Sequence, residues 1–417
     1  MNSSDVIIIG GGAIGVSAAY YLSRAGLKTT VVEKGGICSA CSYGNAGLVS
    51  PSHVIPLSAP GVIHKGLQWM LDAKSPFYLK PRVDFSLFSW LWKFRRSATR
   101  EHVEKSAPVL KDICEFSRNR YEEIAQKEAL QFHFKKNGLL MLYLNSKGEA
   151  ECREMADVAH EVNLECRFIS PSEIPELDPA MHTHAAGALY FPGDAHLEPF
   201  SYTENLAELL KENGVRFLTD TTVEDVRTTN GKITSLKTSR GEITGSEFVL
   251  AAGAWSAQLG RRLGVSFPLQ PAKGYSITLH QPPVQLKIAS ILTEAKVAVT
   301  PMGGMLRFAG TLELAGISES INMRRVKAIR DAVPKYFVNM TAPDLTGAEI
   351  WGGMRPCTPD GLPYIGRVAR FSNLVIATGH AMLGITLAPG TGRLVSELIM
   401  GKTPSLDLQP FDPARFS

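Results

Sequence analysis

The first 33 residues carry the clearest pattern of apolar and polar positions. Residues 6–9 are consecutive β-branched side chains, typical of a strand buried in a parallel sheet. Glycines follow, and residues 16–24 then place apolar side chains at helical spacing up to Gly26, which favours a helix end. Residues 28–32 predict a second strand that ends at Glu33. The order of strand, glycine-rich turn, helix and strand predicts a βαβ unit.

Helical and strand patterns alternate along the rest of the chain. Residues 131–144 alternate around Asn137-Gly138, a turn signal that predicts a hairpin. Residues 170–173, SPSE, have the pattern of a capping box before a short helix. Further helices are predicted at residues 108–127, 147–163, 204–213, 317–336 and 391–400. Further strands are predicted within residues 215–250, within 265–315 and at 373–377.

Patterns typical of a dinucleotide-binding domain occur at both ends and in the middle of the chain, and they enclose two inserts. The sequence therefore predicts an α/β protein, α+β overall, with two interleaved domains. A Rossmann-like domain would take residues 1–50, 185–262 and 345–417, and an antiparallel-sheet substrate domain would take residues 51–184 and 263–344. Residues 60–100, rich in proline, aromatic and basic side chains, would form an insert in the second domain.

Composition narrows the class of protein. Apolar content of 44% and charged content of 20% are ordinary for a globular chain. A net charge of +4, without a dense run of Lys and Arg, argues against a nucleic-acid partner. The N-terminus lacks the pattern of a signal peptide, no stretch reaches about 18 apolar residues, and the cysteines are widely spaced. A cytoplasmic protein with reduced thiols is therefore expected.

Gly10, Gly12 and Gly15 match the G-x-G-x-x-G fingerprint of dinucleotide binding, between a strand and a helix. These glycines permit the tight turn, the approach of the pyrophosphate and close packing of the helix, whose N-terminus faces the phosphates. Glu33 is placed to accept hydrogen bonds from the adenosine ribose. Residues 390–392 lack the third glycine of a second fingerprint. A single site predicts either an NAD dehydrogenase or a flavoprotein reduced directly by its substrate.

Motifs spread over nearly the whole chain bear on this choice. In chain order they are GGGAIG (10–15) with Glu33-Lys34, SYGNAGLVSP (42–51), APG (59–61), PAKGYS (271–276), WGGMRPCTPDG (351–361) and TGHAMLGIT (378–386). With these motifs the chain resembles the D-amino-acid oxidase superfamily of FAD oxidoreductases, and most closely its bacterial D-amino-acid dehydrogenases.

The resemblance implies FAD as the cofactor of the Rossmann-like domain. Sarcosine-oxidase relatives bind FAD covalently through a cysteine several residues before Thr-Pro-Asp, whereas here Cys357 adjoins that motif, so non-covalent FAD is expected. The turn at 379–386 opens a helix, which would direct backbone N–H groups at the negative charge of a reduced flavin. The implied FAD contacts are Gly10, Gly12, Ala13, Ile14, Gly15, Glu33, Lys34, Ser42, Asn45, Ala46, Gly47, Leu48, Val223, Gly253, Gly353, Arg355, Gly379, His380, Leu383, Gly384, Ile385 and Thr386.

Four residues are candidates for binding an amino-acid substrate. Arg355 falls where the family has its carboxylate-binding arginine, and the planar fork of a guanidinium matches a carboxylate with two hydrogen bonds. Tyr275 matches a family position near the substrate, His53 follows the flavin loop, and His380 sits in the flavin turn. Tyr275 could equally be a half-buried strand tyrosine, and His380 a structural histidine. Met382 replaces a second arginine of glycine oxidases, which favours apolar or cyclic substrate side chains.

The resemblance implies oxidative deamination of a D-amino acid. Hydride would pass from Cα to flavin N5, water would hydrolyse the imino acid to a 2-oxo acid and ammonia, and no side chain is named as acid or base. The electrons would pass to a quinone or another carrier, and D-proline, a hydroxyproline isomer and D-alanine are candidate substrates. Two alternatives stay open: an oxidase of the same fold that uses O₂, and a non-catalytic FAD-binding subunit of a membrane complex.

Residues 85–96, FSLFSWLWKFRR, join an aromatic run to a basic cluster. One interpretation is a helix packed into the substrate domain. D-amino-acid dehydrogenases are generally peripheral membrane enzymes, so the other interpretation is a helix that contacts the inner face of the cytoplasmic membrane together with residues 69–71. Lys93, Arg95 and Arg96 would then face anionic headgroups.

Two groups of residues have the side chains of metal or redox sites. Cys38 and Cys41 form a C-x-x-C pair without a second pair, and loop cysteines are expected. The other group fits no zinc spacing and is expected in a surface loop without a metal: His182, His184, Asp194 and His196.

Overall fold

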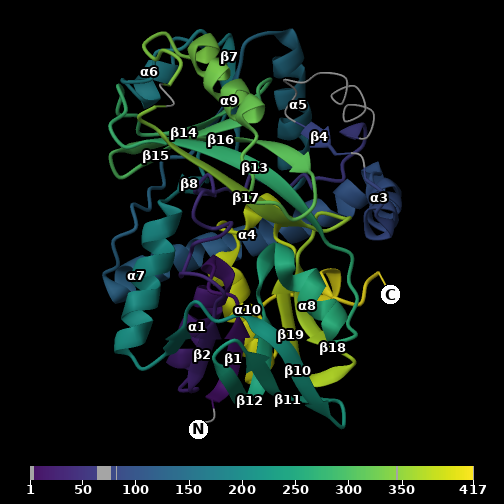
Figure 1. Ribbon diagram of the computed structural model, residues 1–417. Coiled ribbons are helices and arrows are strands. Elements are labelled where there is room, and N and C mark those ends of the chain that lie inside the picture. The colour runs from purple at the N-terminus through teal and green to yellow at the C-terminus, as the bar shows by residue number, and fades with distance from the viewer. Residues whose placement is uncertain (1–3, 63–76, 81, 344–345, 417) are drawn as a thin grey trace.

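The computed structural model describes residues 4–62, 77–80, 82–343 and 346–416, so the expectation for residues 69–71 lies outside the described residues. Two β-sheets are stacked, and each is assembled from separated stretches of chain (Figure 1). The predicted fold class is confirmed, because a mainly parallel sheet with a βαβ unit lies next to a mainly antiparallel sheet.

The first sheet contains the predicted βαβ unit. Strand β1 (Ser4–Ile9) lies between β12 (Gly241–Leu250) and β2 (Thr29–Val32), parallel to both, and α1 (Ala13–Arg24) connects β1 to β2. Both β1 and β2 are almost wholly buried, as expected of parallel strands covered on two faces. The remaining strands are β9 (Arg216–Leu218), β10 (Val223–Thr229), β11 (Lys232–Thr238), β18 (Tyr364–Val368) and β19 (Phe371–Thr378). The order is β10-β11-β12-β1-β2-β9, with β19 beside β12 and β18.

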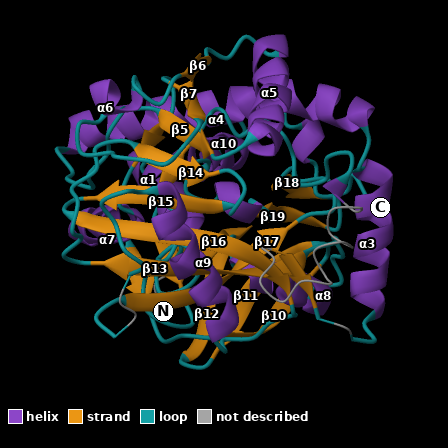
Figure 2. Ribbon diagram, turned by 90° about the horizontal axis from the view of Figure 1, so that it is seen from above, coloured by secondary structure: helices purple, strands orange, loops and turns teal. Residues whose placement is uncertain are grey.

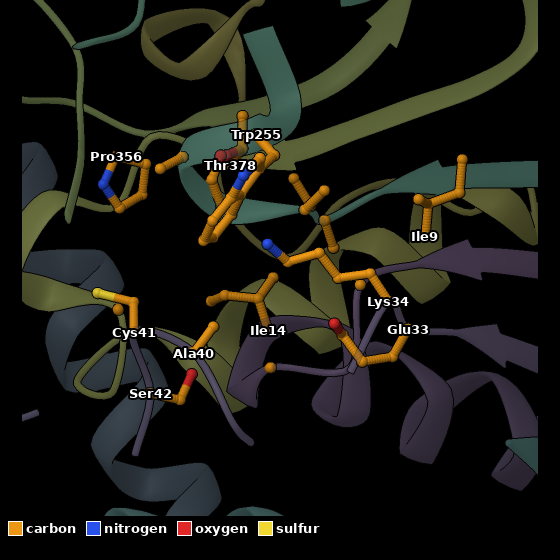
Figure 3. A pocket seen from close by; sticks show the side chains of 18 of the residues that line it. Ile9, Ile14, Glu33, Lys34, Ala40, Cys41, Ser42, Trp255, Pro356 and Thr378 are labelled. Atoms are coloured by element: carbon orange, nitrogen blue, oxygen red, sulfur yellow. The ribbon is translucent and has the colours of Figure 1, made fainter. Parts of the chain in front are cut away.

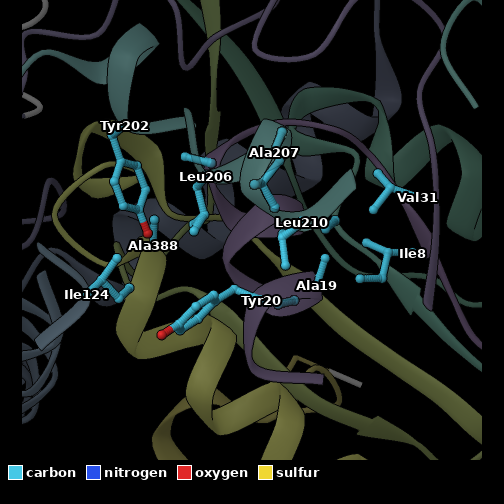
Figure 4. Packing of buried hydrophobic residues seen from close by; sticks show 14 of the residues in the cluster. Ile8, Ala19, Tyr20, Val31, Ile124, Tyr202, Leu206, Ala207, Leu210 and Ala388 are labelled. Carbon is cyan, nitrogen blue, oxygen red and sulfur yellow. The ribbon is translucent and has the colours of Figure 1, made fainter. Parts of the chain in front are cut away.

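Helices cover this sheet and form its main core. They are α1, α4 (Arg100–Glu128), α7 (Pro199–Glu212) and α10 (Ala388–Ile399). Figure 4 shows side chains from the strands and from all four helices meeting in one layer, among them Ile8, Val31, Ala19, Ile124, Leu206 and Ala388. Smaller elements nearby are the pair β3 (Leu48–Val49) and β8 (Ala195–His196), helix α8 (Ser256–Arg262), and the 3₁₀ turns η1 (Gly253–Trp255), η2 (Ala381–Leu383) and η3 (Gln409–Phe411).

The second sheet has the order β17-β13-β16-β15-β14-β5-β7-β6, with β4 beside β16. Its strands are β4 (Phe77–Leu79), β5 (Leu139–Tyr143), β6 (Arg167–Ile169), β7 (Gly187–Phe191), β13 (Gln270–Leu279), β14 (Ala289–Leu292), β15 (Val297–Met302), β16 (Met305–Leu314) and β17 (Glu349–Cys357). Helix α9 (Met323–Tyr336) packs on one face of β13 and β16, and the other face of β13 and β17 is turned toward the first sheet (Figures 1 and 2). Helices α5 (Ser146–Glu161) and α6 (Ile174–Leu177) complete this part.

The hairpin predicted around Asn137-Gly138 is wrong. Gly138 has a φ of +80°, but it forms no turn between two strands, and residues 131–137 form only a single bridge, between Lys135 and His196. Strand β5 pairs with β7 and β14, which lie far along the chain. All five residues of β5 are buried, so non-local packing fixes its partners, not the nearby turn.

Several predicted boundaries shift. Helices α4 and α7 begin earlier than expected, because the Thr99 and Glu198 side chains accept backbone N–H bonds at the first turn, and α9 begins late, after the Asn322 cap. Strands β7 and β17 belong to the second sheet, although the boundaries predicted at 185 and 345 placed them with the Rossmann-like domain.

The aromatic segment forms helix α3 (Phe85–Ser97), which begins where the Asp84 carboxylate accepts bonds from the N–H groups of Ser86 (2.9 Å) and Leu87 (3.2 Å). Its inner face buries Leu87, Trp90 and Phe94, and the Trp90 indole N–H donates to the Cys357 carbonyl oxygen at 2.9 Å. The helix is therefore partly core, which confirms one of the two interpretations for its inner face.

The two tryptophans of α3 provide a matched test of this orientation. Trp90 is 2% exposed and stacks on Phe94 with ring centroids 5.0 Å apart, whereas Trp92 is 62% exposed. Trp90→Ala should lower the apparent free energy of unfolding by about 3–5 kcal/mol, because it leaves a cavity. Trp92→Ala should change it by less than about 0.5 kcal/mol. Urea unfolding followed by circular dichroism measures both, and similar losses would contradict the assigned faces.

Candidate functional site

A cavity opens where the parallel strands of the first sheet end. Ile9, Val32, Ala251 and Ala377 line it from the carboxyl ends of β1, β2, β12 and β19. In open α/β sheets ligands bind at this edge, where the loops that follow the strands diverge. Figure 3 shows the lining side chains converging on the opening.

The glycine fingerprint sets the shape of one cavity wall. Gly10 has a φ of +119°, and a Cβ on it would lie 2.4 Å from the Ala251 carbonyl oxygen. A Cβ on Gly15 would lie 1.9 Å from the Gly10 carbonyl oxygen. The backbones therefore touch only because side chains are missing, and this contact directs the first N–H groups of α1 at the cavity. The Ala13 N–H donates to Ser42 Oγ at 3.0 Å, which brings the next loop to the same wall.

The carboxylate of Glu33 lies at the cavity, at the end of β2. It accepts N–H bonds from Gly11 (2.7 Å) and Gly35 (3.1 Å), which fix its position. The ammonium of Lys34 lies 3.4 Å from the ring centroid of Trp255, so these two side chains close the cavity near Glu33 (Figure 3). An acidic side chain beside a helix N-terminus fits the ribose and pyrophosphate of a dinucleotide.

Two loops at the other end of the cavity are bonded to each other. Thr386 Oγ1 donates to the Leu48 carbonyl at 2.9 Å, and Asn45 Nδ2 donates to the Met382 carbonyl at 3.5 Å. Tyr121 of α4 supports them through a bond from its hydroxyl to the Ile385 carbonyl (2.5 Å). Residues 42–48 and 379–386, which the sequence assigns to the flavin, are thus neighbours in space.

Arg307, on β16, ties the second sheet to the first of these loops. Its Nη1 donates to the carbonyl oxygens of Tyr43 (2.8 Å) and Asn45 (2.9 Å), and its Nε donates to Thr278 Oγ1 (2.9 Å). The side chain is buried, so breaking these bonds would leave a charged donor without partners.

His380 lines the cavity as a neutral side chain. Its Nε2 lies 3.0 Å from Thr391 Oγ1, and burial lowers its pKa to about 3. The imidazole is therefore uncharged at neutral pH and offers no positive charge to a substrate carboxylate.

The structure brings many of the predicted FAD contacts to the cavity wall. These are Gly10, Gly12, Ala13, Ile14, Glu33, Lys34, Ser42, Asn45, Val223, Gly253, His380, Gly384 and Ile385. Other predicted contacts are absent from the lining and stay predictions: Gly15, Ala46, Gly47, Leu48, Gly353, Arg355, Gly379, Leu383 and Thr386.

Arg355 and Tyr275 lie on opposite faces of the second sheet. In the β13–β17 ladder Arg355 pairs with Ala272, while Tyr275 pairs with Gly352, three positions further on, so their side chains point in opposite directions. The Tyr275 hydroxyl donates to Glu313 Oε2 at 3.0 Å within the core that α9 covers. The structure therefore does not bring Tyr275 to the cavity, and its alternative interpretation as a buried strand tyrosine accounts for it.

Arg355 lies on the face of β17 that is turned toward the cavity. The indole of Trp351, on the same face of β17, lies against Gly44, in the loop that lines the cavity. Burial raises the pKa of the lining thiol Cys41 to about 11, and the Arg355 guanidinium acts in the opposite direction. Arg355 Nη1 donates to the Thr311 carbonyl at 2.7 Å. Among the described residues no carboxylate forms an ion pair with Arg355, so the remaining donors are available to an anionic ligand.

The other predicted polar residues lie apart from the cavity. His53 is not in its wall, and burial lowers the pKa of His53 to about 4. Asp194 and His196 are buried, which corrects their expected place in a surface loop, whereas His182 and His184 are exposed. The Asp194 carboxylate accepts bonds from Ser52 Oγ (2.5 Å) and Ser52 N (3.1 Å), and burial raises its pKa to about 7. Within the described ranges no three such side chains group as metal ligands.

Several residues of the cavity wall were not predicted from the sequence. The additional lining residues include Ala40, Cys41, Thr221, Thr222, Trp255, Gln258 and Arg262. Thr221 and Thr222 precede the predicted contact Val223, and Trp255 follows Gly253, so their positions just past strand ends were the available signal. Cys41 faces the cavity, while Cys38 is buried, and both lie in the turn after β2 as expected of loop cysteines.

Known proteins resemble this chain over its whole length. A family model described as FAD dependent oxidoreductase (DAO) matches residues 5–398. The D-amino acid dehydrogenases of Granulibacter bethesdensis and Methylobacterium nodulans are 31% and 33% identical to the chain, with 99% of each chain covered. Glycine oxidase from Geobacillus kaustophilus has the same fold, with a TM-score of 0.76, 24% identity and full coverage of both chains. L-proline dehydrogenase from P. horikoshii gives a TM-score of 0.75 at 22% identity, covering 100% and 98% of the two chains.

The glycine-walled cavity at the carboxyl edge of the parallel strands defines a dinucleotide-binding protein. With the match over residues 5–398 and relatives more than 30% identical, the chain belongs to the DAO family of FAD-dependent oxidoreductases. The helix N-terminus, the glycine cradle and Glu33 fit FAD, and these residues would hold its pyrophosphate and ribose.

Glu33 offers a direct test of this assignment. Glu33→Gln should weaken FAD binding roughly tenfold to hundredfold, because a charge-assisted bond to the ribose becomes a neutral one. Titration of the apoprotein with FAD, followed by flavin fluorescence, gives the affinity. Glu154→Gln, an exposed carboxylate on α5, is the matched control and should bind FAD like the parent. Equal affinities for all three proteins would remove Glu33 from the site.

Proposed function

We propose that this protein is a dehydrogenase that oxidatively deaminates a D-amino acid and passes the electrons to a quinone or another carrier. The observation that carries the proposal is Arg355, a guanidinium on the strand next to the FAD cavity that has no carboxylate partner among the residues the structure describes. The family and the D-amino acid dehydrogenases at 31–33% identity support the reaction class. The proposed substrates are D-alanine, whose imine water would hydrolyse to a 2-oxo acid and ammonia, and D-proline or a hydroxyproline isomer, whose oxidation would give a cyclic imine without release of ammonia.

Arg355 would bind and orient the substrate carboxylate. Its bond to Thr311 fixes one side of the guanidinium, and the fork of remaining N–H groups matches a carboxylate with two hydrogen bonds. Thr311 lies in a bulge of β16 with a φ of 64°, so the backbone bends locally where it holds the arginine. Met382, 40% exposed in the turn after β19, supplies no second cation, which suits substrates with apolar side chains.

Non-covalently bound FAD supplies the two-electron oxidation of the substrate Cα–H bond. The protein would supply orientation rather than proton transfer. His380 is neutral and is bonded to Thr391, and Tyr275 is bonded to Glu313 on the far face of the sheet. We therefore assign no side chain the role of acid or base, and the substrate amine would lose its proton to solvent.

Anaerobic addition of D-amino acids to the purified holoenzyme tests the reaction. Bleaching of the flavin absorbance, with turnover in the presence of an artificial dye, is the expected outcome. Formation of hydrogen peroxide in air at the rate of substrate loss would show that the enzyme is an oxidase and not a dehydrogenase. No bleaching by any amino acid would favour the non-catalytic subunit.

The outer face of α3 is the proposed membrane contact. Phe85, Phe88 and Trp92 are 86%, 55% and 62% exposed, and Arg95 and Arg96 continue the exposed stripe by about one helical turn. The helix lies at the edge of the molecule in both views (Figures 1 and 2). Apolar side chains would enter the acyl boundary while the arginines meet anionic headgroups. Within the described part of the chain, no helix has the length and apolar character of a membrane span.

Substitution of Arg355 tests the carboxylate anchor. Arg355→Ala should raise the apparent KM about hundredfold through loss of a charge-assisted contact. Arg355→Lys keeps the charge but not the fork, so most of that loss should remain. Steady-state kinetics with a dye acceptor measures both, with Arg153→Ala on α5 as control and flavin absorbance as the check on FAD content. An unchanged KM would place the anchor elsewhere.

The outer stripe of α3 can be tested without touching its buried face. Phe85→Ser/Phe88→Ser/Trp92→Ser should lower the affinity for phosphatidylglycerol vesicles at least about tenfold, because each buried side chain contributes roughly 1.5–3 kcal/mol. The measurement is co-flotation of the protein with these vesicles. The control is Val338→Ser, which removes an apolar side chain that is 58% exposed and lies outside α3, and this variant should float with the vesicles like the parent. If the triple variant also floats like the parent, α3 is not the membrane contact.

A further inference from the structure

At three glycines near Arg355, the space that a side chain would fill is taken by the side chain of another residue. A Cβ on Gly44 would lie 2.0 Å from Cε3 of Trp351, and a Cβ on Gly353 would lie 1.7 Å from Cη2 of the same indole. A Cβ on Gly274 would lie 2.2 Å from Nη2 of Arg355. The missing side chains leave room for two planar groups to lie against the backbone.

Strand pairing places these two planar groups on one face of the sheet. Trp351, Gly353 and Arg355 alternate along β17, so all three point to the side that faces the cavity. Gly353 and Gly274 are directly opposite each other in the ladder, which sets their Cβ positions about 5 Å apart. The indole reaches the first of these positions and the guanidinium reaches the second. The two groups therefore lie side by side above the same pair of residues.

The indole is also held from the side of the first sheet. Gly44 lies between Ser42 and Asn45, which both line the FAD cavity. The six-membered ring of Trp351 is thus enclosed by Gly44 and Gly353, and any side chain at either position would displace it. Trp351 itself is half-buried, so part of its surface remains open.

We propose that Trp351 determines substrate specificity by forming the apolar wall of the substrate site. The inference rests on the proposed function in one respect: the carboxylate of the substrate binds Arg355. A carboxylate on the guanidinium brings the rest of the substrate onto the adjacent indole. A pyrrolidine ring keeps its carbons close to its own carboxylate and has no side-chain rotamers to lose, so it contacts this wall at low entropic cost. The methyl group of D-alanine contacts it much less. The site therefore selects cyclic secondary amino acids.

Kinetics of two Trp351 variants test the selectivity. In the holoenzyme with a dye acceptor, Trp351→Leu should lower the ratio of kcat/KM for D-proline to that for D-alanine about tenfold or more. Trp351→Phe, which retains an aromatic face, should recover most of the ratio. Gly353→Ala should lower it without removing the indole, because the new methyl group displaces the ring. Trp92→Leu on α3 is the matched control. Equal losses for both substrates at unchanged FAD content would give Trp351 a structural role only and overturn the proposal.

A binding measurement separates this inference from the proposed function. Pyrrole-2-carboxylate and acetate are titrated into the holoenzyme, and the shift of the flavin spectrum is recorded. Trp351→Leu should weaken pyrrole-2-carboxylate about tenfold and leave acetate nearly unchanged. If no amino acid is oxidised but Trp351→Leu weakens only pyrrole-2-carboxylate, the proposed reaction is wrong and the role of Trp351 as the apolar wall is supported. If pyrrole-2-carboxylate does not bind, or binds equally to parent and variant, the wall is wrong.

Discussion

The side-chain-free contact between the end of β1 and the end of β12 is the constraint on which the site depends. A Cβ on Gly10 would lie 2.4 Å from the Ala251 carbonyl oxygen, and a Cβ on Gly15 would lie 1.9 Å from the Gly10 carbonyl oxygen. This contact fixes β1, α1 and β12 relative to one another, so the start of α1 faces the cavity. Glu33, at the end of the neighbouring β2, then faces the same opening. The loops at 42–48 and 379–386 complete a cavity whose first wall is already set.

Buried polar contacts, not shared strands, hold the second sheet over this cavity. Arg307 donates to the Tyr43 and Asn45 carbonyls, and Cys357 of β17 forms a backbone bridge with His380 in the turn after β19. A buried donor without a partner costs about 1–3 kcal/mol, and more when charged, so shifting the sheets apart is unfavourable. These contacts involve the loop 42–48, which lines the cavity, and the strand that bears Arg355. These few bonds therefore determine where the strand that bears Arg355 meets the cavity.

The sequence was sufficient where a local pattern determines the structure. The turn from Gly10 to Gly15 and the helix after it depend on neighbouring residues, so motif and spacing predicted them and the position of Glu33 at the end of β2; its contact with the ribose stays a prediction. The hairpin at 131–144 failed because β5 takes both partners from distant strands. Tyr275 was misplaced for a related reason: motif position gives the strand, but the face follows from register, and register is non-local. Trp351 was not singled out, because only the folded contact with Gly44 gives it a place in the site.

The two faces of α3 connect the edge of the molecule to the strand that bears Arg355. Its inner face packs on Ala381 and Cys357, and the bond from Trp90 ends two residues beyond Arg355. A helix fixed in this way cannot move far without moving β17. Under the proposed function, a bilayer in contact with Phe85, Phe88 and Trp92 would therefore lie close to β17, the strand that carries the proposed substrate anchor. Glu33 and Trp255 lie at the other end of the cavity, so the adenosine end of FAD would be away from that surface. Such an orientation would place the reacting end of the cofactor nearer to a carrier dissolved in the membrane, while the substrate enters from water.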